Sequence, residues 1–232
     1  MRHSIDIRVW AGVFLAMTLL LLTGCSSGQP TLQQIFDRNI EVMGGRDAFV
    51  ALEGRTVRGR QIDDRPYAGP AVTSRLEARA DTAGHWSMTL TDGSGVYAEG
   101  RDAAGSWSRK PGEEVKPLDH FNAKLGYLLD PQGPLNLAEH FPNPRLTGTR
   151  IFEGVTYWMV ENDLKYEYDT LYFEVETGLL SRIGYHWWLE DFRGVDGVLV
   201  PHTIVRGRKG GSTNLYWDEV VHGEVGEVTR EF

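Results

Sequence analysis

The first clear pattern of apolar positions along the chain is helical and begins just after Thr31. Apolar side chains recur there at three- and four-residue steps: Leu32, Ile35, Phe36, Ile40 and Met43. Thr31 and Gln34 have the spacing of a capping box, and Gly44-Gly45 supplies a stop signal. The pattern therefore predicts an amphipathic helix over residues 31–43, followed by a short helical turn over Asp47–Leu52.

From Arg55 onward the period changes to two, with short apolar runs separated by turn residues. The predicted strands lie near Arg55–Ile62, Val72–Ala80, His85–Thr91, Gly95–Gly100, Ser106–Arg109, Leu146–Phe152, Thr156–Asn162, Thr170–Glu176, Leu179–Trp188, Glu190–Val195, Val198–Arg208 and Thr213–His222. Glycine-containing pairs such as Asp196-Gly197 mark the turns between them. About a dozen antiparallel strands are expected.

A helical pattern interrupts the strands half-way along the chain. After Pro117, leucines and a phenylalanine repeat at three- and four-residue steps as far as Asp130, and residues 135–141 form a second candidate between Pro134 and Pro142. A sheet of this size must curl, and its concave face must be filled. The predicted fold class is α+β and mainly β: a strongly curved antiparallel sheet with an N-terminal helix and a helical insertion covering the concave face.

The N-terminal segment has the pattern of an export signal. Arg2 and Arg8 precede an apolar run over residues 9–22, which is shorter than the roughly 20 residues that a spanning helix needs. The run ends in Leu-Thr-Gly-Cys, which resembles a bacterial lipobox, and Cys25 is the only cysteine of the chain. This similarity implies cleavage before Cys25 and its acylation by chains such as palmitate, which would anchor the domain in a membrane. Ser26 in place of aspartate is similar to lipoproteins that are sent to the outer membrane.

Charge and length narrow the class of protein. The chain has a net charge of −8, and removal of residues 1–24 makes it one unit more negative. Because no basic stripe is present, nucleic acid is not an expected partner. The expected organisation is a signal peptide (1–24), a lipidated tether (25–30) and a single domain (31–232) facing the periplasm.

Catalytic and metal-binding motifs are absent from the sequence. There is no His-Glu-x-x-His or Gly-x-Ser-x-Gly motif, and the seven histidines have no metal-chelating spacing. Carboxylate pairs such as Glu174 and Glu176 are more typical of a solvated strand face than of a glycosidase. No catalytic residue, metal or cofactor is predicted, although a Ser/His/Asp site assembled from distant positions remains an alternative.

Three stretches resemble the LolA/LolB-like superfamily, in particular its outer membrane lipoprotein-sorting branch. They are FDRNIEVMGGRDAFVALEGRTVRG (36–59), YFEVETGLLSRI (172–183) and EDFRGVDGVLVPHTIV (190–205). The resemblance implies an eleven-stranded half-barrel with helices closing its mouth around an apolar cavity that holds the acyl chains of a lipoprotein.

The chain has more aromatic residues than a small core usually takes, and an acyl-chain pocket is lined mainly by such side chains. The predicted ligand cavity and lid consist of Trp86, Trp107, Leu118, Phe121, Leu125, Leu128, Tyr157, Phe173 and Tyr185. The alternative is that the lid residues simply pack on the sheet and leave no cavity. We expect a non-catalytic lipoprotein that binds a lipoprotein acyl chain or a lipid, with a role in lipoprotein or lipid transport. A module that assembles with, or senses, another envelope protein is the second hypothesis, and a hydrolase the third.

Overall fold

The chain divides into two compact units, Met1–Pro30 and Thr31–Phe232. The structure is a computed structural model that describes residues 28–64, 69–118, 122–164, 170–208, 211–228 and 230. The predicted signal peptide, Cys25 and Phe121 lie outside the described residues. Every helix and strand described below belongs to the second unit, which also contains the hydrophobic core.

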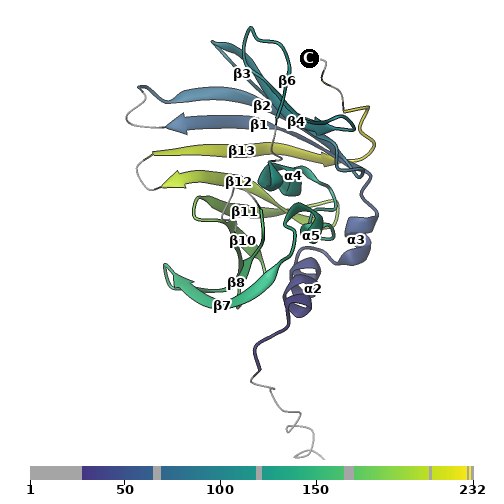
Figure 1. Ribbon diagram of the computed structural model, residues 1–232, viewed down its shortest axis with the longest axis vertical. Helices are drawn as coiled ribbons and strands as arrows, with labels where there is room; N and C mark the ends of the chain where they lie inside the picture. Colours follow the sequence, from purple (N-terminus) through teal and green to yellow (C-terminus); the bar gives the residue numbers. More distant parts are fainter. Residues whose placement is uncertain are drawn as a thin grey trace, which may run out of the picture. The chain divides into compact units, whose positions relative to one another are not determined.

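In the described part of the chain, thirteen strands form one antiparallel sheet in the order β6-β5-β4-β3-β2-β1-β13-β12-β11-β10-β9-β8-β7 (Figure 1). Their bounds are β1 Gly54–Asp64, β2 Val72–Asp81, β3 Trp86–Asp92, β4 Gly95–Asp102, β5 Gly105–Arg109, β6 Lys116–Pro117, β7 Arg145–Phe152, β8 Val155–Glu161, β9 Leu171–Glu174, β10 Leu180–Ile183, β11 Trp187–Val195, β12 Val198–Arg208 and β13 Gly211–His222. The sheet curls around α4 and α5 (Figure 1). The prediction of a curved antiparallel half-barrel with helices is therefore confirmed, with thirteen strands rather than about eleven.

One predicted strand boundary is wrong. The sequence predicts strands over Leu179–Trp188 and Glu190–Val195, whereas β10 ends at Ile183 and β11 begins at Trp187. The chain turns between them at Gly184, whose φ is 62°. Arg182 holds this turn by donating to the carbonyl oxygens of Gly184 (3.1 Å) and Tyr185 (3.0 Å). The apolar residues on both sides of the turn hide it from a pattern-based prediction.

The N-terminal helix forms as predicted, whereas the inserted helices are shorter. In α2 (Leu32–Val42), the capping box of Thr31 and Gln34 is present, and α3 (Arg46–Val50) follows it. In the insertion, α4 spans Ala123–Leu129 and α5 spans Leu137–His140. The predicted helix start at Pro117 is wrong. Pro117 belongs to strand β6 and pairs with Trp107 of β5, and the Leu118 amide donates to the Ser106 carbonyl.

The main core lies between the helices and one face of the sheet. Ala78 of β2 lies beside Val57 of β1 and Met88 of β3, and all three side chains are almost fully buried. Leu125 and Leu128 of α4 belong to the same hydrophobic cluster. On the other half of the sheet, the ring of Phe36 in α2 lies 5.7 Å from that of Phe173 in β9. The helices thus cover this face along much of the sheet.

The three stretches that carry the family resemblance meet at α2. A Cβ on Gly44 would lie 2.3 Å from the Gly197 carbonyl oxygen, so the end of the helix rests directly on the turn between β11 and β12. The Asn39 side chain, 1% exposed, donates to the Gly178 carbonyl at 3.1 Å. Arg38 donates to the Glu176 carbonyl at 2.6 Å. The first stretch therefore binds the turns of the other two, which explains why the three occur together.

Candidate ligand cavity

The helix-covered face has a filled end and an open end. At the filled end, α4 leaves a space of about 20 Å³, which is room for about one water molecule. It is lined by Met43, Phe49, Arg55, Tyr127, Leu128, Pro134, Leu180, Leu189, Phe192, Leu199, Val200 and Pro201. The open end holds a cavity of about 410 Å³, within the range of small-molecule sites. Of these two spaces, only the open end has room for a ligand while α4 keeps this position.

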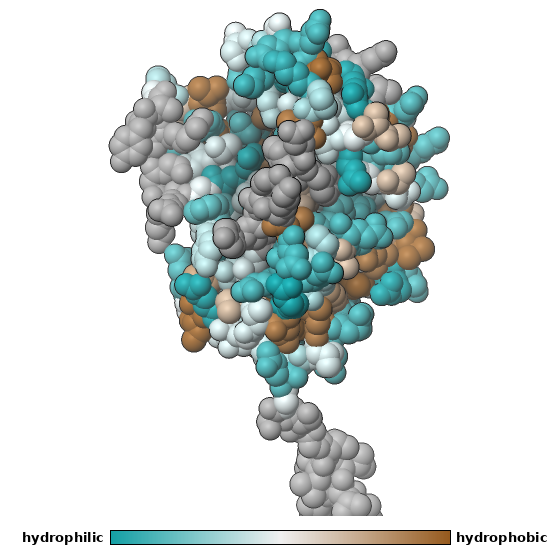
Figure 2. All heavy atoms as spheres, viewed as in Figure 1, coloured by the Kyte–Doolittle hydropathy of each residue, from teal (hydrophilic) through white to brown (hydrophobic). Residues whose placement is uncertain are grey.

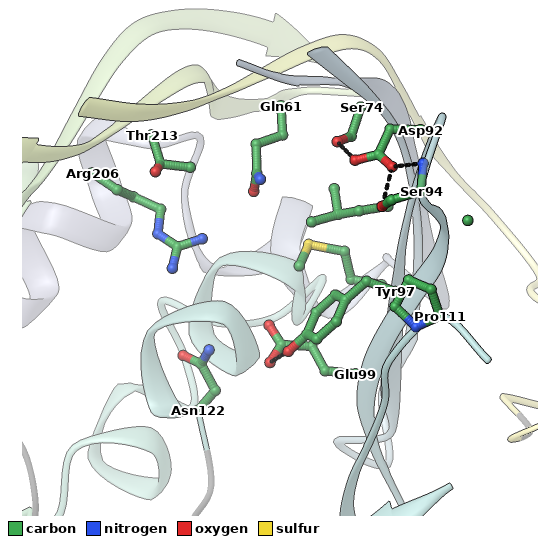
Figure 3. Close-up of a pocket in the computed structure, with 13 residues that line it drawn as sticks. Gln61, Ser74, Asp92, Ser94, Tyr97, Glu99, Pro111, Asn122, Arg206 and Thr213 are labelled. Carbon is green, nitrogen blue, oxygen red and sulfur yellow. Dashed lines mark hydrogen bonds between the residues drawn. The ribbon is translucent and has the colours of Figure 1, made fainter. Parts of the chain in front are cut away.

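Strand pairing explains which side chains line the cavity of about 410 Å³ at the open end. Leu90 of β3 pairs with Leu76 on one side and with Tyr97 of β4 on the other. Across β1 and β13 the same face carries Gln61 and Thr213, and Arg206 follows in β12. The full lining is Gln61, Ser74, Met88, Leu90, Asp92, Ser94, Gly95, Tyr97, Glu99, Pro111, Asn122, Arg206 and Thr213 (Figure 3). Most of the lining side chains are therefore polar, and Met88, Leu90, Pro111 and the Tyr97 ring supply the apolar surface.

At one side of this cavity, Asp92 is bound by its own neighbours. Its carboxylate accepts from the Ser74 hydroxyl (2.9 Å), the Ser94 hydroxyl (2.6 Å) and the Ser94 amide (2.8 Å) (Figure 3). These hydrogen bonds, led by the Ser94 hydroxyl, lower the pKa of Asp92. Asp92 is consequently a carboxylate at neutral pH, with acceptor sites that are already used.

Tyr97 and Glu99 form a second polar pair in the cavity. The Tyr97 hydroxyl donates to Glu99 Oε2 at 3.2 Å. Burial, reinforced by the negative charge of Glu99, raises the pKa of Tyr97 above its usual value. The phenol therefore stays protonated and acts as a hydrogen-bond donor.

Two cationic side chains share the ring of Trp187 beside the cavity. The guanidinium carbon of Arg206 lies 4.7 Å from the ring centroid, and Nζ of Lys124 lies 5.4 Å from the same centroid. Trp187 is only 7% exposed, and β11–β12 pairing places it next to Arg206. Lys124 belongs to α4, two residues after Asn122 in the cavity lining. The Trp187 ring is thus contacted by cations from both α4 and β12.

A buried polar network closes the filled end. Arg55, 5% exposed, donates to the Leu128 carbonyl at 2.6 Å and to His222 Nε2 at 3.0 Å. Burial lowers the pKa of Arg55 to about 10, so it remains charged at neutral pH. The nearby Asp130 carboxylate lies 2.8 Å from His140 Nε2 and accepts from Asn136 at 3.0 Å. The Arg55 contact thus holds the end of α4 against the sheet, and the Asp130 contacts join α4 to α5.

The predicted cavity residues fall into three groups. Trp86, Leu125, Leu128 and Phe173 are buried in the main core on the helix-covered face, and Leu128 lines the 20 Å³ space. Leu118 is half-buried beside β5, and Phe121 lies outside the described residues. The remaining three, Trp107, Tyr157 and Tyr185, are not part of the main core cluster.

Strand parity separates Trp107 and Tyr157 from the other aromatic residues. Trp107 pairs with Gly100, whereas Trp86 pairs with Arg101, so the two indoles point to opposite faces. Tyr157 likewise alternates with Trp158, whose partner is Phe173. Tyr157 lines a separate hollow of about 440 Å³, and Tyr185 is 49% exposed.

The outer hollow is an aromatic and arginine cluster. The Arg182 guanidinium stacks on Phe152 (4.2 Å), Trp188 (4.7 Å) and Tyr172 (5.3 Å). Burial lowers the pKa of Arg182, which is consistent with its position among the rings. Because these aromatic side chains occupy the face opposite the helices, part of the aromatic excess stabilises a second layer and does not line the cavity.

Sequence reasoning missed the residues that line the cavity at the open end of the helix-covered face. Gln61, Arg206 and Thr213 lie on strands that the sequence did predict, but the search for an apolar pocket passed over polar side chains. The available signal was the alternation within β12 and β13, which puts Arg206 and Thr213 on the same face as Ile204 and Leu215.

No group of histidine, cysteine, aspartate or glutamate side chains with metal-binding geometry occurs in the described residues. Within the same residues, no helix is long and apolar enough to cross a membrane.

Figure 2 shows hydrophobic side chains gathered over α2 and α3, where Val50 is 61% exposed. The upper part of this view is mainly hydrophilic (Figure 2).

A half-open antiparallel sheet with helices over a cavity defines a LolA/LolB-like fold. A LolA superfamily protein from Nitrosomonas europaea superimposes with a TM-score of 0.57 at 12% identity, covering 85% of this chain and 96% of its own. A DUF1329 family protein from Desulfovibrio piger gives a TM-score of 0.56 at 12% identity, covering 84% and 94%. No protein-family model matches the chain, and no curated protein sequence matches it significantly. The chain thus has the LolA/LolB-like fold that its sequence resembles.

Proposed function

We propose that this protein is a lipid-anchored outer-membrane lipoprotein whose periplasmic domain binds a hydrophobic or amphiphilic ligand. The ligand is a lipoprotein acyl chain or a lipid, and the role is in lipoprotein or lipid transport within the envelope. The observation that carries this proposal is the cavity of about 410 Å³ on the helix-covered face of a LolA/LolB-like sheet. Met88, Leu90 and the Tyr97 ring offer apolar contact in it.

The N-terminal pattern supports the proposed location. The apolar run before Cys25 and the Leu-Thr-Gly-Cys tetrad are typical of a lipoprotein precursor. Two or more acyl chains on the mature N-terminus anchor a domain stably. The negative charge of the domain adds no electrostatic attraction to anionic lipid, so the anchor would supply membrane attachment.

The cavity chemistry favours binding over catalysis. The hydroxyls of Ser74 and Ser94 both donate to Asp92, and no histidine is among the described residues that line the cavity. A serine nucleophile needs an adjacent general base to become reactive, and the lowered pKa of Asp92 makes this carboxylate a weak one. The arrangement therefore offers hydrogen bonds and apolar contact to a ligand without an activated nucleophile.

The test is identification of the bound molecule. Residues 26–232, which contain the whole second unit, are purified without detergent, extracted with organic solvent and analysed by mass spectrometry. We expect a co-purified lipid, with a Leu90→Trp variant carrying much less of it because the indole fills the cavity. Ile151→Trp, at a site 68% exposed on β7, is the matched control. An empty protein that also fails to bind added fatty acid would contradict the proposal.

A protein-binding role is the second candidate, and the edge of the sheet favours it. Among the described strands β7 ends the sheet order, and Ile151 of β7 (68%) and Val155 at the start of the adjacent β8 (38%) are exposed. Exposed edge strands can pair with a strand of another protein. This role predicts that an envelope protein co-purifies with the chain and is lost on Ile151→Lys, while the lipid content does not change.

A further inference from the structure

A second hollow, of about 440 Å³, lies on the face of the sheet opposite the helices and has no part in the proposed function. Arg182, which is only 7% exposed, lines this hollow together with Tyr157 and Trp188. The volume lies within the range of small-molecule sites. The hollow is therefore large enough for a ligand, and the chemistry of its lining decides which kind it takes.

The guanidinium group of Arg182 keeps hydrogen-bond donors for a ligand. Of its five N–H groups, one on Nε donates to the Gly184 carbonyl and one on Nη2 donates to the Tyr185 carbonyl. In the part of the chain that the structure describes, the other three have no acceptor. These three belong to Nη1 and Nη2, which together form the end of the guanidinium. A carboxylate or a phosphate accepts two parallel hydrogen bonds from such an edge.

Arg182 also has no counter-ion. Among the described residues no carboxylate forms an ion pair with it, and aromatic rings stabilise its charge instead. Its guanidinium carbon lies 4.2 Å from the Phe152 ring centroid, and that of Arg150 lies 4.5 Å from the same centroid. Burial lowers the pKa of Arg182, and the charge of Arg150 lowers it further, whereas Glu153 acts in the opposite direction. A buried cation without a counter-ion is costly, so an anion that reaches Arg182 would be bound favourably.

Carboxylates line the same hollow, and strand pairing explains why two of them lie near Arg182. Arg182 pairs with Tyr172 of β9 and with Trp188 of β11. Glu174 and Glu190 each lie two residues beyond one of these partners, so they share the face of Arg182. Because both strands run antiparallel to β10, both carboxylates lie towards the same end of that strand. One hollow is thus lined by a cation and, to one side of it, by two carboxylates.

The charges of the lining disfavour a ligand of a single sign. Arg182 shares the lining with the carboxylates of Glu153, Glu174 and Glu190. Glu174 accepts from the Thr177 hydroxyl at 2.7 Å, and the exposed Glu190 has no hydrogen bond or ion pair within the described residues. An anion alone would be repelled by the carboxylates, and a cation alone would leave Arg182 without a counter-ion. A ligand that carries both charges satisfies both requirements.

We infer that this hollow binds a small zwitterion, whose anionic group contacts Arg182 and whose ammonium group contacts Glu174 and Glu190. Its apolar part lies against Trp188 and Val155, which is 38% exposed. The shared chemistry is that of an amino acid, a short peptide with free termini or a phosphoethanolamine head group. This site is separate from the cavity of about 410 Å³, so the inference goes beyond the proposed function and does not rest on it.

The test compares four forms of one dipeptide that differ only in their charged groups. Calorimetry on residues 26–232 measures the affinity of dileucine, N-acetyl-dileucine, dileucine amide and N-acetyl-dileucine amide. We expect dileucine to bind about tenfold more tightly than its amide, because the amide lacks the anion that accepts hydrogen bonds from the buried Arg182. We expect it to bind about threefold more tightly than its acetylated form, because an ion pair with the exposed Glu190 is partly screened.

Two further probes identify the source of the zwitterion. Free leucine represents an amino acid, and glycerophosphoethanolamine represents a lipid head group. The probe that binds most tightly among these two and dileucine assigns the chemical class, and each of the three results supports the inference.

Variants separate the two charged contacts. Arg182→Gln is expected to reduce the affinity for dileucine and for its acetylated form about tenfold, without reducing that for the amide. Glu190→Gln is expected to reduce the affinity for dileucine and for its amide about threefold, without reducing that for the acetylated form. Glu161→Gln, at an exposed site on β8 outside the lining, is the matched control. Circular dichroism establishes folding, and Glu190→Gln decides the matter if Arg182→Gln does not fold.

Equal affinity for the four dileucine forms, or binding of none of the probes, would overturn this inference. Either result would leave the proposed lipid-binding function standing, because that function uses the other cavity. A preference for dileucine that survives in both Arg182→Gln and Glu190→Gln would show that the zwitterion binds elsewhere, and it would also overturn the inference.

Discussion

At the scale of single residues, buried polar side chains hold the helical insertion on the sheet. Arg55 joins β1 to the carbonyl oxygen of Leu128, and its Nε donates to His222. Nε2 of His222 accepts this hydrogen bond and therefore carries no proton. The imidazole is then neutral, with its one proton on Nδ1. Removing either partner would leave a buried polar group without a hydrogen bond, which typically costs about 1–3 kcal/mol.

His222 makes the stability of the domain depend on pH. Burial, with the charge of Arg55 as the second cause, lowers its pKa from 6.5 to about 4. The unfolded chain takes up a proton near pH 6.5 and the folded chain only near pH 4. The free energy of unfolding is therefore expected to fall as the pH is lowered from about 6.5 to about 4.

Urea unfolding at pH 7.5 and at pH 5 measures this effect. His222→Gln retains an acceptor for Arg55 without an ionisable ring, so its loss of stability between the two pH values is expected to be smaller. His186→Gln removes an exposed histidine and is the control. An equal loss in His222→Gln and the unchanged chain would contradict the role assigned to His222.

At the scale of elements, α2 is positioned by two turns of the sheet, one at residues 176–178 and one at residues 196–197. Leu199 donates its amide to the Met43 carbonyl at 2.7 Å, and Gly44 lies against the Asp196-Gly197 turn. Asp196 and Gly197 have φ values of 50° and 86°, as a type I′ hairpin requires. The glycines are therefore needed for two different reasons, close approach at Gly44 and turn geometry at Gly197.

Replacing Gly44 tests this packing. Gly44→Ala places a methyl group 2.3 Å from the Gly197 carbonyl oxygen at a φ of 129°, so we expect a loss of about 3 kcal/mol in the free energy of unfolding. Gly45→Ala, at a φ of 87° with no atom within 4 Å of the new methyl, is expected to cost about 1 kcal/mol. Chemical denaturation of both variants gives the comparison; similar losses would show that the contact with Gly197 is unimportant.

At the scale of the second unit, the two faces of the curved sheet carry different groups of side chains. The helix-covered face holds the main core and the open cavity, whereas the other face carries the Arg182 cluster and the Trp107 region. Arg230 near the C-terminus pairs with Asp102 of β4 at 2.5 Å. On the helix-covered face, the cavity of about 410 Å³ therefore lies where α4 does not fill the space over the sheet.

The proposed membrane attachment belongs to the protein as a whole. Metabolic labelling of the full-length chain with palmitate is expected to label the protein, and Cys25→Ser is expected to abolish the label because no other thiol is present. Ser26→Ala, which keeps the cysteine, is the control. Equal labelling of Cys25→Ser would show that Cys25 is not the acylated residue.

By itself the sequence determined the elements and their local chemistry. Periods of two and of 3.6 residues, glycine turns and the Thr31–Gln34 capping box depend on neighbours within one segment, and they predicted the strands and α2. They also led to the fold, because Gly44, Gly178 and Gly197 stand where close contacts leave no room for a side chain or where turns need a positive φ.

Only the tertiary structure decided which face each side chain uses and where the cavity lies. Alternation along a strand predicts that the side chains of Trp107 and Ser108 point to opposite faces of the sheet. Only the pairing of Trp107 with Gly100 determines which of the two faces the helices. The cavity depends on where α4 ends its contact with the sheet, and Asn122 and Pro117 shorten that helix. Strand pairing and helix packing bring together residues that are far apart in the chain. The pattern within one segment therefore does not specify these contacts.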